Sequence, residues 1–409
     1  MAELPSPIPL GLVVDGIGSH PAAWRLAPEQ ARAAYGARYH LDQVRLAERG
    51  GFDFVIFEDR YGSGAADGPA FRGRLDAALL AARLAPVTER IGLVPTFAVT
   101  HAEPFHVSKS VATLDHASLG RAGWLVGIST DPVAADLIGR RSAPDSAEAW
   151  REAAEAADVV QRLWDSWEDD AEIRDVATGR FVDADRLHYV DFAGDHFSVK
   201  GPSITPRPPQ GQPPTFVRTA DPNAEAVIGH GADVVVSRLA GPDDRGGLDD
   251  HHAFVRDVRE LVAEAGRPEG AVTVLAELDV TVAASAAEAA EVAGRLDEAI
   301  GGPRREDAGR FVGSADRLAE FLGDTAPLVG GFVINFSVLP TQLPIFVDRV
   351  LPRVPGLGGL AAESRTGSLR STFGLGRPVN RYATEPRAEA APDPAPHRHC
   401  DRCAATAAR

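Results

Sequence analysis

Apolar and polar residues follow two periods along this chain. Short, nearly continuous apolar runs predict strands, and the longer segments between them, with an apolar residue every three or four positions, predict helices. The predicted strands cover residues 10–15, 52–59, 91–99, 122–129, 214–219, 232–240, 271–283 and 331–339. Strands that are apolar at almost every position are buried on both faces, which is typical of a parallel sheet covered by helices.

The predicted helices alternate with these strands. They cover residues 40–51, 74–86, 104–118, 146–167, about 221–230, about 250–265, a stretch that ends near 300, another from about 314, and 341–354. Eight strand–helix units predict an α/β fold of the closed (β/α)8 type, a TIM barrel. The spacing of the predicted strands and helices is also compatible with an open doubly wound sheet.

Two segments fall outside this repeat. Residues 168–213 are an irregular insertion between the fourth helix and the fifth strand, and we expect them to form a lid or a substrate wall. Residues 384–409 are rich in Ala, Pro and Arg, which is typical of a disordered tail. We therefore predict one barrel domain over residues 1–383, followed by that tail.

The amino-acid composition of the chain argues against some classes of binding partner. The formal net charge of −16 argues against nucleic acid or an anionic membrane surface as a partner. No run of eighteen apolar residues and no signal-like N-terminus is present, so we expect a cytoplasmic protein.

The only cysteines, Cys400 and Cys403, lie in the motif HRHCDRC (397–403), whose four candidate ligands are too close in sequence to suit one tetrahedral site. We predict no metal site.

Polar residues stand at the ends of several predicted strands. In a barrel the carboxyl ends of the strands meet at one rim, so Asp59, Thr96, Ser129 and Thr219 would gather there. Trp150, near the start of its helix, could reach the same rim. The alternative is that each polar residue caps the next helix.

The Gly16–Pro21 loop begins like a dinucleotide-binding motif but has proline where the third glycine belongs, so we interpret it as a turn.

Long motifs of this chain resemble those of the bacterial luciferase-like flavin monooxygenases, and within them the nitrilotriacetate and dibenzothiophene-sulfone monooxygenase group. The resemblance extends from about residue 10 to 383. It is carried by AERGGFDFVIFED, RIGLVPTFAVTHAEPFHVSKSVATLDHASLGRAGW, LWDSWEDDA, TGRFVDADRLHYVDFAGDHFSVKGPSITPRPPQGQP and LRSTFGLGRPVNRY.

This resemblance implies a (β/α)8 barrel that forms a homo-oligomer and works with a separate flavin reductase. The reductase supplies reduced FMN, and the flavin and O₂ oxygenate a small organic substrate in a water-poor pocket. No side chain stands out as a catalytic acid or base, because the flavin carries the chemistry in such enzymes.

The resemblance also assigns cofactor-binding positions. Asp59 and Thr96 match the family's residues near the flavin ring, and Ser129 ends a strand in which Leu125 replaces a family asparagine. The family's His-x-x-x-Tyr pair, which helps to hold the flavin phosphate, corresponds to Ser146 and Trp150. The Gly-Ser-Ser phosphate turn corresponds to Ala220-Asp221-Pro222.

Asp221 would place a carboxylate against the flavin phosphate. At about 4 Å and an effective dielectric constant of about 20, each pair of like charges costs roughly 4 kcal/mol. Three alternatives follow. FMN binds differently, with Arg218, Arg140 or Arg141 at its phosphate; a deazaflavin replaces it; or the chain is a flavin-free pseudoenzyme or partner-binding subunit.

Overall fold

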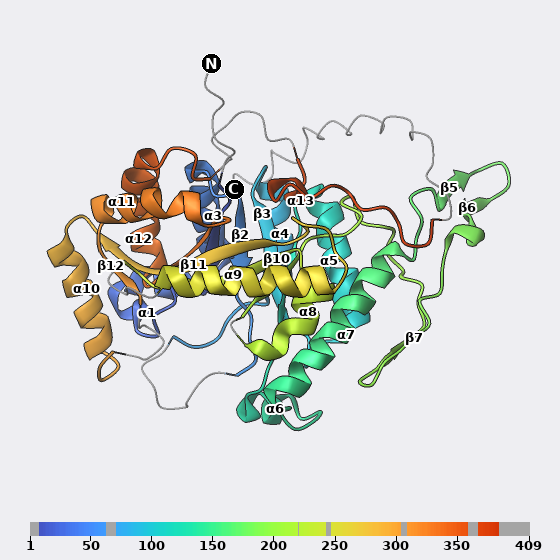
Figure 1. Ribbon diagram of the computed structural model, residues 1–409, viewed down its shortest axis with the longest axis horizontal. Helices are drawn as coiled ribbons and strands as arrows, with labels where there is room; N and C mark the ends of the chain where they lie inside the picture. Colours follow the sequence, from blue (N-terminus) through green and yellow to red (C-terminus); the bar gives the residue numbers. More distant parts are fainter. Residues whose placement is uncertain are drawn as a thin grey trace, which may run out of the picture.

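Eight parallel strands form a closed barrel at the centre of the molecule (Figure 1). The computed structural model describes residues 8–62, 71–219, 221–242, 247–303, 309–358 and 367–383. The ring runs in the order β1, β2, β3, β4, β9, β10, β11 and β13, and the pairing of β13 with β1 closes it. These strands are Leu10–Val14, Phe54–Phe57, Gly92–Ala98, Trp124–Gly127, Thr215–Arg218, Val234–Arg238, Thr273–Ala283 and Phe332–Phe336. The predicted barrel and its eight strands are confirmed.

One short strand outside the ring was not predicted from the hydrophobic pattern. The second half of β11 pairs in parallel with a short strand, β12 (Phe311–Ser314), which lies outside the ring. With only four residues, β12 falls between two helices and lacks a run long enough to mark it as a strand.

Helices surround the barrel, as expected for a parallel sheet. Their bounds are α1 Ala23–Leu26, α2 Pro28–Ala33, α3 Ala37–Gly50, α4 Ala77–Leu84, α5 Pro104–Ser118, α6 Pro132–Ile138, α7 Ser146–Asp165, α8 Glu225–His230, α9 Gly247–Glu264, α10 Ala286–Glu298, α11 Ala315–Thr325, α12 Leu339–Ile345 and α13 Leu369–Thr372. Within the described ranges, no helix is both long and apolar enough to cross a membrane.

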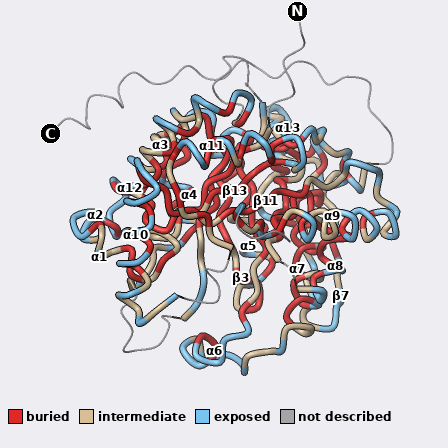
Figure 2. The backbone as a smooth tube through the Cα atoms, turned by 60° about the vertical axis from the view of Figure 1, so that its left-hand side comes forward, coloured by how far each residue is buried: buried red, intermediate tan, exposed pale blue. Residues whose placement is uncertain are grey.

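The core has an inner and an outer part (Figure 2). Inside the barrel, apolar residues of the strands pack together and onto α13, which closes the end where the strands begin. The ring of Phe373 contacts those of Phe54 and Phe216, with ring centroids 5.7 and 5.6 Å away. The other clusters fill the space between strands and helices.

The insertion runs along the outside of the barrel beside α7. It contains two small antiparallel hairpins, β5–β6 (Glu172–Asp175 and Arg180–Val182) and β7–β8 (Phe192–Ala193 and Ser198–Val199). Figure 1 shows β5–β6 projecting sideways from the barrel. The tip of the second hairpin is held against α7 because Glu155 accepts hydrogen bonds from the backbone N–H groups of Asp195 and His196, at 3.0 and 3.2 Å.

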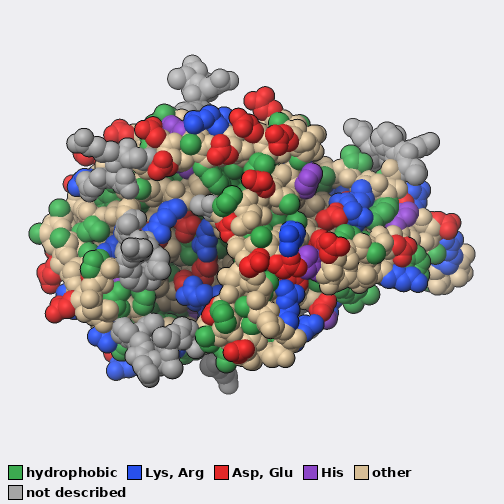
Figure 3. Space-filling model, turned by 60° about the horizontal axis from the view of Figure 1, so that its bottom comes forward, with side chains coloured by type: hydrophobic (Ala, Val, Ile, Leu, Met, Phe, Trp, Pro, Cys, Tyr) green, Lys and Arg blue, Asp and Glu red, His purple; other side chains and the backbone are tan. Residues whose placement is uncertain are grey.

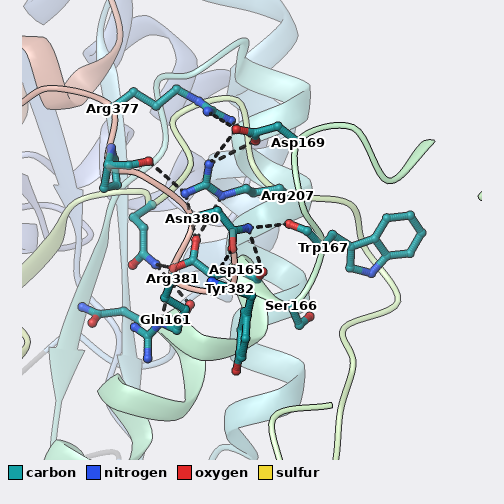
Figure 4. Close-up of polar contacts among 12 residues, drawn as sticks. Gln161, Asp165, Ser166, Trp167, Asp169, Arg207, Arg377, Asn380, Arg381 and Tyr382 are labelled. Carbon is teal, nitrogen blue, oxygen red and sulfur yellow. Dashed lines mark hydrogen bonds and ion pairs between the residues drawn. The ribbon is translucent and has the colours of Figure 1, made fainter. Parts of the chain in front are cut away.

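A network of ion pairs joins the insertion, the end of α7 and the C-terminal segment 367–383 (Figure 4). Arg207 bonds Asp165 at 3.0 Å and both oxygens of Asp169, also at 3.0 Å. Arg377 binds the same Asp169 carboxylate at 2.6 and 2.7 Å. Burial opposes ionisation of Asp169, but the two arginines outweigh it and lower its pKa to about 2.

The resemblance motifs form a second polar network at the same end of the barrel. The guanidinium of Arg121 is buried and donates to the carbonyl oxygens of Ser118, Ala85 and Ile91, each at 2.8 Å. Asp115, fully buried, accepts from the backbone and side-chain N–H groups of Gln210 at 3.0 and 2.6 Å. These motif residues tie helix ends and loops together beneath the strands, so their role is architectural.

The predicted tail 384–409, with its HRHCDRC motif, lies outside the described residues.

Candidate active site at the barrel mouth

The carboxyl ends of the strands carry a layer of polar side chains. Because side chains alternate along a strand, residues two apart share a face. A polar residue two positions after the last apolar inner residue of a strand therefore points into the barrel mouth. The layer comprises Asp15, Glu58, Thr96, Arg218, Arg238, Glu277, Asp279 and Asn335. We call it the mouth layer. In TIM barrels this end of the strands holds the active site.

Arg218 crosses the mouth of the barrel. It contacts Glu58 on β2 at 2.6 Å and Glu277 on β11 at 3.4 Å. β3 and β4 lie between β9 and β2 in the ring, so the Arg218–Glu58 pair spans two intervening strands. This ion pair occupies space that an open mouth would leave for a ligand.

A second group of polar contacts lies beside this pair. Arg238 contacts Asp279 at 2.5 Å, and the amide of Asn335 donates to the same carboxylate at 2.9 Å. Asp15 contacts Arg74 at 2.8 Å and Arg60 at 3.3 Å. Each of these acids therefore has a cation within ion-pair distance.

Glu277 is an acid of the layer whose pKa is raised. Burial raises it to about 7; Arg218 and, more weakly, Arg238 oppose this, and the nearby carboxylates Asp279 and Glu58 add to it. A carboxyl group that titrates near neutral pH at the mouth of a barrel is a candidate acid or base.

The mouth layer borders a cavity of about 510 Å³. It is lined by Val13, Asp15, Ser19, Glu58, Arg60, Arg218, Thr219, Val236, Arg238, Glu277, Asp279 and Asn335. Figure 3 shows this face, on which acidic and basic side chains gather around a hollow. No lining residue belongs to 168–213, whereas His196 and Phe197 of the insertion line a separate cavity, so the role of the insertion as a lid or substrate wall stays a prediction.

Two predicted ring-contact residues have different surroundings. Asp59 points away from the cavity, and its carboxylate accepts a hydrogen bond at 3.1 Å from the backbone of Ala77, at the start of α4. Burial raises its pKa. Thr96 is buried beside Leu125 on the neighbouring strand, and no described residue forms a hydrogen bond with its hydroxyl oxygen.

Ser129 and Thr219 also follow barrel strands, but only Thr219 lines the cavity. The buried Ser129 donates its backbone N–H to the hydroxyl of Thr100 at 3.0 Å. The aliphatic side chain of Leu125 packs with the apolar interior of the barrel.

The structure brings Ser146, Trp150 and Asp221 together. The hydroxyl of Ser146 donates to Asp221, and the nearby Trp150 side chain also helps to lower the pKa of this carboxylate. The backbone and side-chain N–H groups of Asn223 donate to its other oxygen at 2.9 and 2.8 Å. Hydrogen bonding, first from Ser146 and then from Asn223, lowers the pKa of Asp221. Asp221 is therefore an ionised carboxylate with hydrogen bonds to both oxygens. Ala220 lies outside the described residues.

The arginines considered for a phosphate have carboxylate partners. Arg141 forms two hydrogen bonds with Glu152, at 2.8 and 2.6 Å, and Arg140 bonds Glu103 at 3.1 Å. Both arginines line a separate cavity of about 160 Å³ next to the tip of β7–β8. Within the described ranges, no group of three or more His, Cys, Asp or Glu side chains is arranged to hold a metal ion.

The comparison with known proteins gives relatives along almost the whole chain. Nitrilotriacetate monooxygenase component A of Aminobacter aminovorans is 29% identical over 450 residues, with 91% of this chain and 98% of that protein covered. Dibenzothiophene-sulfone monooxygenase of Rhodococcus erythropolis is 33% identical over 225 residues, 53% of this chain and 49% of that protein.

Two further relatives belong to one enzyme, the pristinamycin IIA synthase of Streptomyces pristinaespiralis. One of its subunits is 41% identical over 170 residues, 42% of this chain and 53% of that protein. The other is 29% identical over 440 residues, 91% of this chain and 97% of that protein.

The fold has close structural counterparts. The EDTA monooxygenase of Chelativorans sp. BNC1 superposes with a TM-score of 0.78 at 20% identity, covering 91% of this chain and 99% of that one. The model of the luciferase-like monooxygenase family matches residues 19–331. The predicted resemblance is confirmed: this chain belongs to the luciferase-like monooxygenase family.

Proposed function

We propose that this chain works in a flavin monooxygenase system as a luciferase-like subunit that leaves FMN binding to another chain. The observation that carries the proposal is the Ser146–Trp150–Asp221 cluster. The resemblance aligns these residues with the family's phosphate contacts, and here a carboxylate of the chain itself receives the hydrogen bonds that a phosphate would need.

A phosphate fits this arrangement poorly. A carboxylate offers about four acceptor positions, and the Ser146 hydroxyl and the two N–H groups of Asn223 already fill three of those on Asp221. Each pair of like charges between Asp221 and a phosphate at about 4 Å costs about 1 kcal/mol in water and roughly 4 kcal/mol at a partly buried site. Pro222 also lacks the backbone N–H that other residues would offer there.

The mouth layer supports the same proposal. The Glu58–Arg218–Glu277 contacts fill part of the barrel mouth with charge, and the three fused rings of a flavin placed against them would displace or desolvate them. The two pristinamycin IIA synthase subunits are both similar to this chain, so one enzyme contains two different luciferase-like subunits. We infer the same arrangement for this chain, with a flavin-binding luciferase-like chain as its partner.

Quenching of FMN fluorescence tests the proposal directly. We expect no saturable quenching by the wild-type chain up to FMN concentrations far above about 10 μM, the range in which a functional site would be filled. The double variant Asp221→Ser/Trp150→Tyr should show saturable quenching at about 10 μM FMN, since it removes the charge and restores the family's tyrosine. The variant Asp136→Ser removes a charge from exposed α6 and serves as the control.

Two outcomes would contradict the proposal in different ways. Wild-type binding below about 10 μM would make the chain a flavin-binding protein in its own right. An unchanged affinity in the double variant would mean that the phosphate site lies elsewhere.

A second candidate function is an FMN-dependent monooxygenase that oxygenates a small organic substrate with reduced FMN from a separate reductase. Two observations favour it: the buried Thr96 hydroxyl has no hydrogen-bond partner among the described residues, and the cavity of about 510 Å³ lies within the volume range of small-molecule sites. A deazaflavin cofactor meets the same objection as FMN, because it also carries phosphate. The titration above separates the two candidates.

A further inference from the structure

We propose that the mouth cavity binds a small organic cation, a molecule with a protonated amine, and that Glu277 is its charge partner. This inference goes beyond the proposed function and stands apart from it, because it rests on the charges of the cavity wall and not on the phosphate site.

The acids that line the cavity are unequally paired. Asp15, Glu58 and Asp279 each have a cation within 2.8 Å. Glu277 contacts the Arg218 guanidinium at 3.4 Å, and the same guanidinium holds Glu58 at 2.6 Å. Glu277 therefore shares a cation whose closer contact is with another acid.

The pairing of the charges in the wall favours a cation over an anion. Four acids line the cavity together with three arginines, Arg60, Arg218 and Arg238, and a fourth arginine, Arg74, contacts Asp15 from outside the lining. The formal charges therefore balance, and the preference rests on the weak pairing of Glu277. An anionic ligand would have to draw these arginines from the carboxylates they already contact. An ammonium group beside Glu277 instead adds a closer partner and breaks no ion pair.

The surroundings of Glu277 also make its ionisation costly without a ligand. The residue is 9% exposed, and burial together with Asp279 and Glu58 raises its pKa to about 7. A bound cation would lower that pKa and hold the carboxylate ionised. Val13 and Val236 line the same cavity and offer apolar contact for the carbon skeleton of the ligand. The recognised chemistry is thus a positive charge joined to a compact hydrocarbon group.

Calorimetric titration with a matched pair of probes tests this inference. Benzylammonium carries the charge, and benzyl alcohol has nearly the same shape without it. At pH 8 and low salt, we expect the wild-type chain to bind benzylammonium at least about tenfold more tightly. Glu277→Gln should abolish that preference, and Glu260→Gln on the exposed face of α9 should keep it. Equal affinity for both probes, or a preference that survives Glu277→Gln, would overturn the inference.

A pH series on the wild-type chain provides a test that needs no variant. With the pKa of Glu277 at about 7, most of the free protein is ionised at pH 8 and about a tenth at pH 6. Affinity for benzylammonium should therefore fall roughly tenfold from pH 8 to pH 6, while that for benzyl alcohol stays constant. A benzylammonium affinity that does not change with pH would also overturn the inference. No flavin is present in either test. A negative result here would therefore overturn the cation-binding inference and leave the outcome of the FMN titration unaffected.

Discussion

The two ends of the barrel differ in how they use charged residues. At the end where the strands begin, Arg121, Asp115 and Arg207 are buried, and each makes several short hydrogen bonds to fixed partners. At the end where the strands finish, Arg218 divides its contacts between two acids beside a cavity. The first arrangement joins parts of the chain together, and the second leaves charge available to a ligand.

This difference explains why the resemblance is strong and yet does not determine the chemistry. The long shared motifs supply Asp115, Arg121, Arg207 and Gln210, which form the networks beneath the strands. The positions at which this chain departs from the family lie at the opposite end. Membership of the family therefore follows from residues that hold the fold, and the function depends on a different set.

The largest effect is expected from breaking the network beneath the strands. Arg121→Ala would leave the carbonyl oxygens of Ser118, Ala85 and Ile91 buried without their donor. Since each unsatisfied buried acceptor costs about 1–3 kcal/mol, we expect the free energy of unfolding to fall by more than about 3 kcal/mol. Urea denaturation followed by circular dichroism measures this change.

Arg121→Lys is the matched control for that variant. It keeps the charge but lacks the planar fork that reaches several carbonyls at once, so it should recover only part of the loss. A decrease below about 1 kcal/mol in the alanine variant would mean that the network adds little to stability.

A smaller effect is expected from breaking the ion pair across the mouth. Arg218→Met would leave Glu58 and Glu277 without the cation between them, at a cost of about 2 kcal/mol at pH 8 after allowance for partial exposure. Without Arg218 the pKa of Glu277 rises further above its unfolded value, so the folded form binds more protons. The variant should therefore regain stability as the pH falls from 8 to 6.

The double variant Glu58→Gln/Arg218→Met sharpens this test. It removes an acid together with the cation, so it should be more stable at pH 8 than Arg218→Met alone. Thermal unfolding of both variants across the pH range measures the effect. A pH profile of Arg218→Met that parallels that of the wild type would show that these acids are not coupled through Arg218.

The smallest effect is expected at the tip of the insertion. His196 contacts Glu148 at 2.8 Å and Glu155 at 3.1 Å. Burial lowers its pKa, but the hydrogen bond to Glu148 and the interaction with Glu155, helped by the charge of nearby Glu152, outweigh burial and raise it above 6.5. The stabilisation is therefore fully present below pH 6.5 and is lost as the pH rises through the folded pKa.

Amide hydrogen exchange at Asp195 and His196 measures this local effect. Between pH 6 and 8 these amides should lose protection several-fold more in the wild type than in His196→Gln, whose side chain does not titrate. Global stability should change little. Equal loss of protection in the two proteins would exclude His196 as the titrating group.

Much of the fold could be predicted because burial on both faces makes each barrel strand a nearly unbroken apolar run. All eight strands have this character, as in Phe54–Phe57 and Phe332–Phe336. β12 has only four residues and gives too weak a signal. The path of the insertion depends on contacts with α7 and the C-terminal segment, which no local pattern encodes.

The site was less predictable for a reason of strand geometry. At the end of β2, the sequence presents Glu58 and Asp59 in succession; the resemblance names Asp59 as a flavin contact, which stays a prediction, and Glu58 was not named. Side chains alternate along a strand, so Glu58 lies on the inner face with Ile56, two positions before it. Counting positions from Ile56 would therefore have identified Glu58 from the sequence. The same rule would have identified Glu277 and Asp279 in AVTVLAELDV and Asn335 in GFVINF. Ser146, Trp150 and Asp221 could be placed only through the resemblance; their close approach in the structure fits that alignment, and their role in cofactor binding stays a prediction.

The closure of the barrel by α13 also affects when the protein can complete its fold during synthesis. Leu369 and Phe373, which cover the inner ends of Phe54 and Phe216, are among the last described residues of the chain. At about 5–20 residues per second, a ribosome needs roughly 20 to 70 s to reach them. Until then the aromatic residues at that end remain uncovered, so the nascent chain completes this part of its core only after Leu369 and Phe373 have been added.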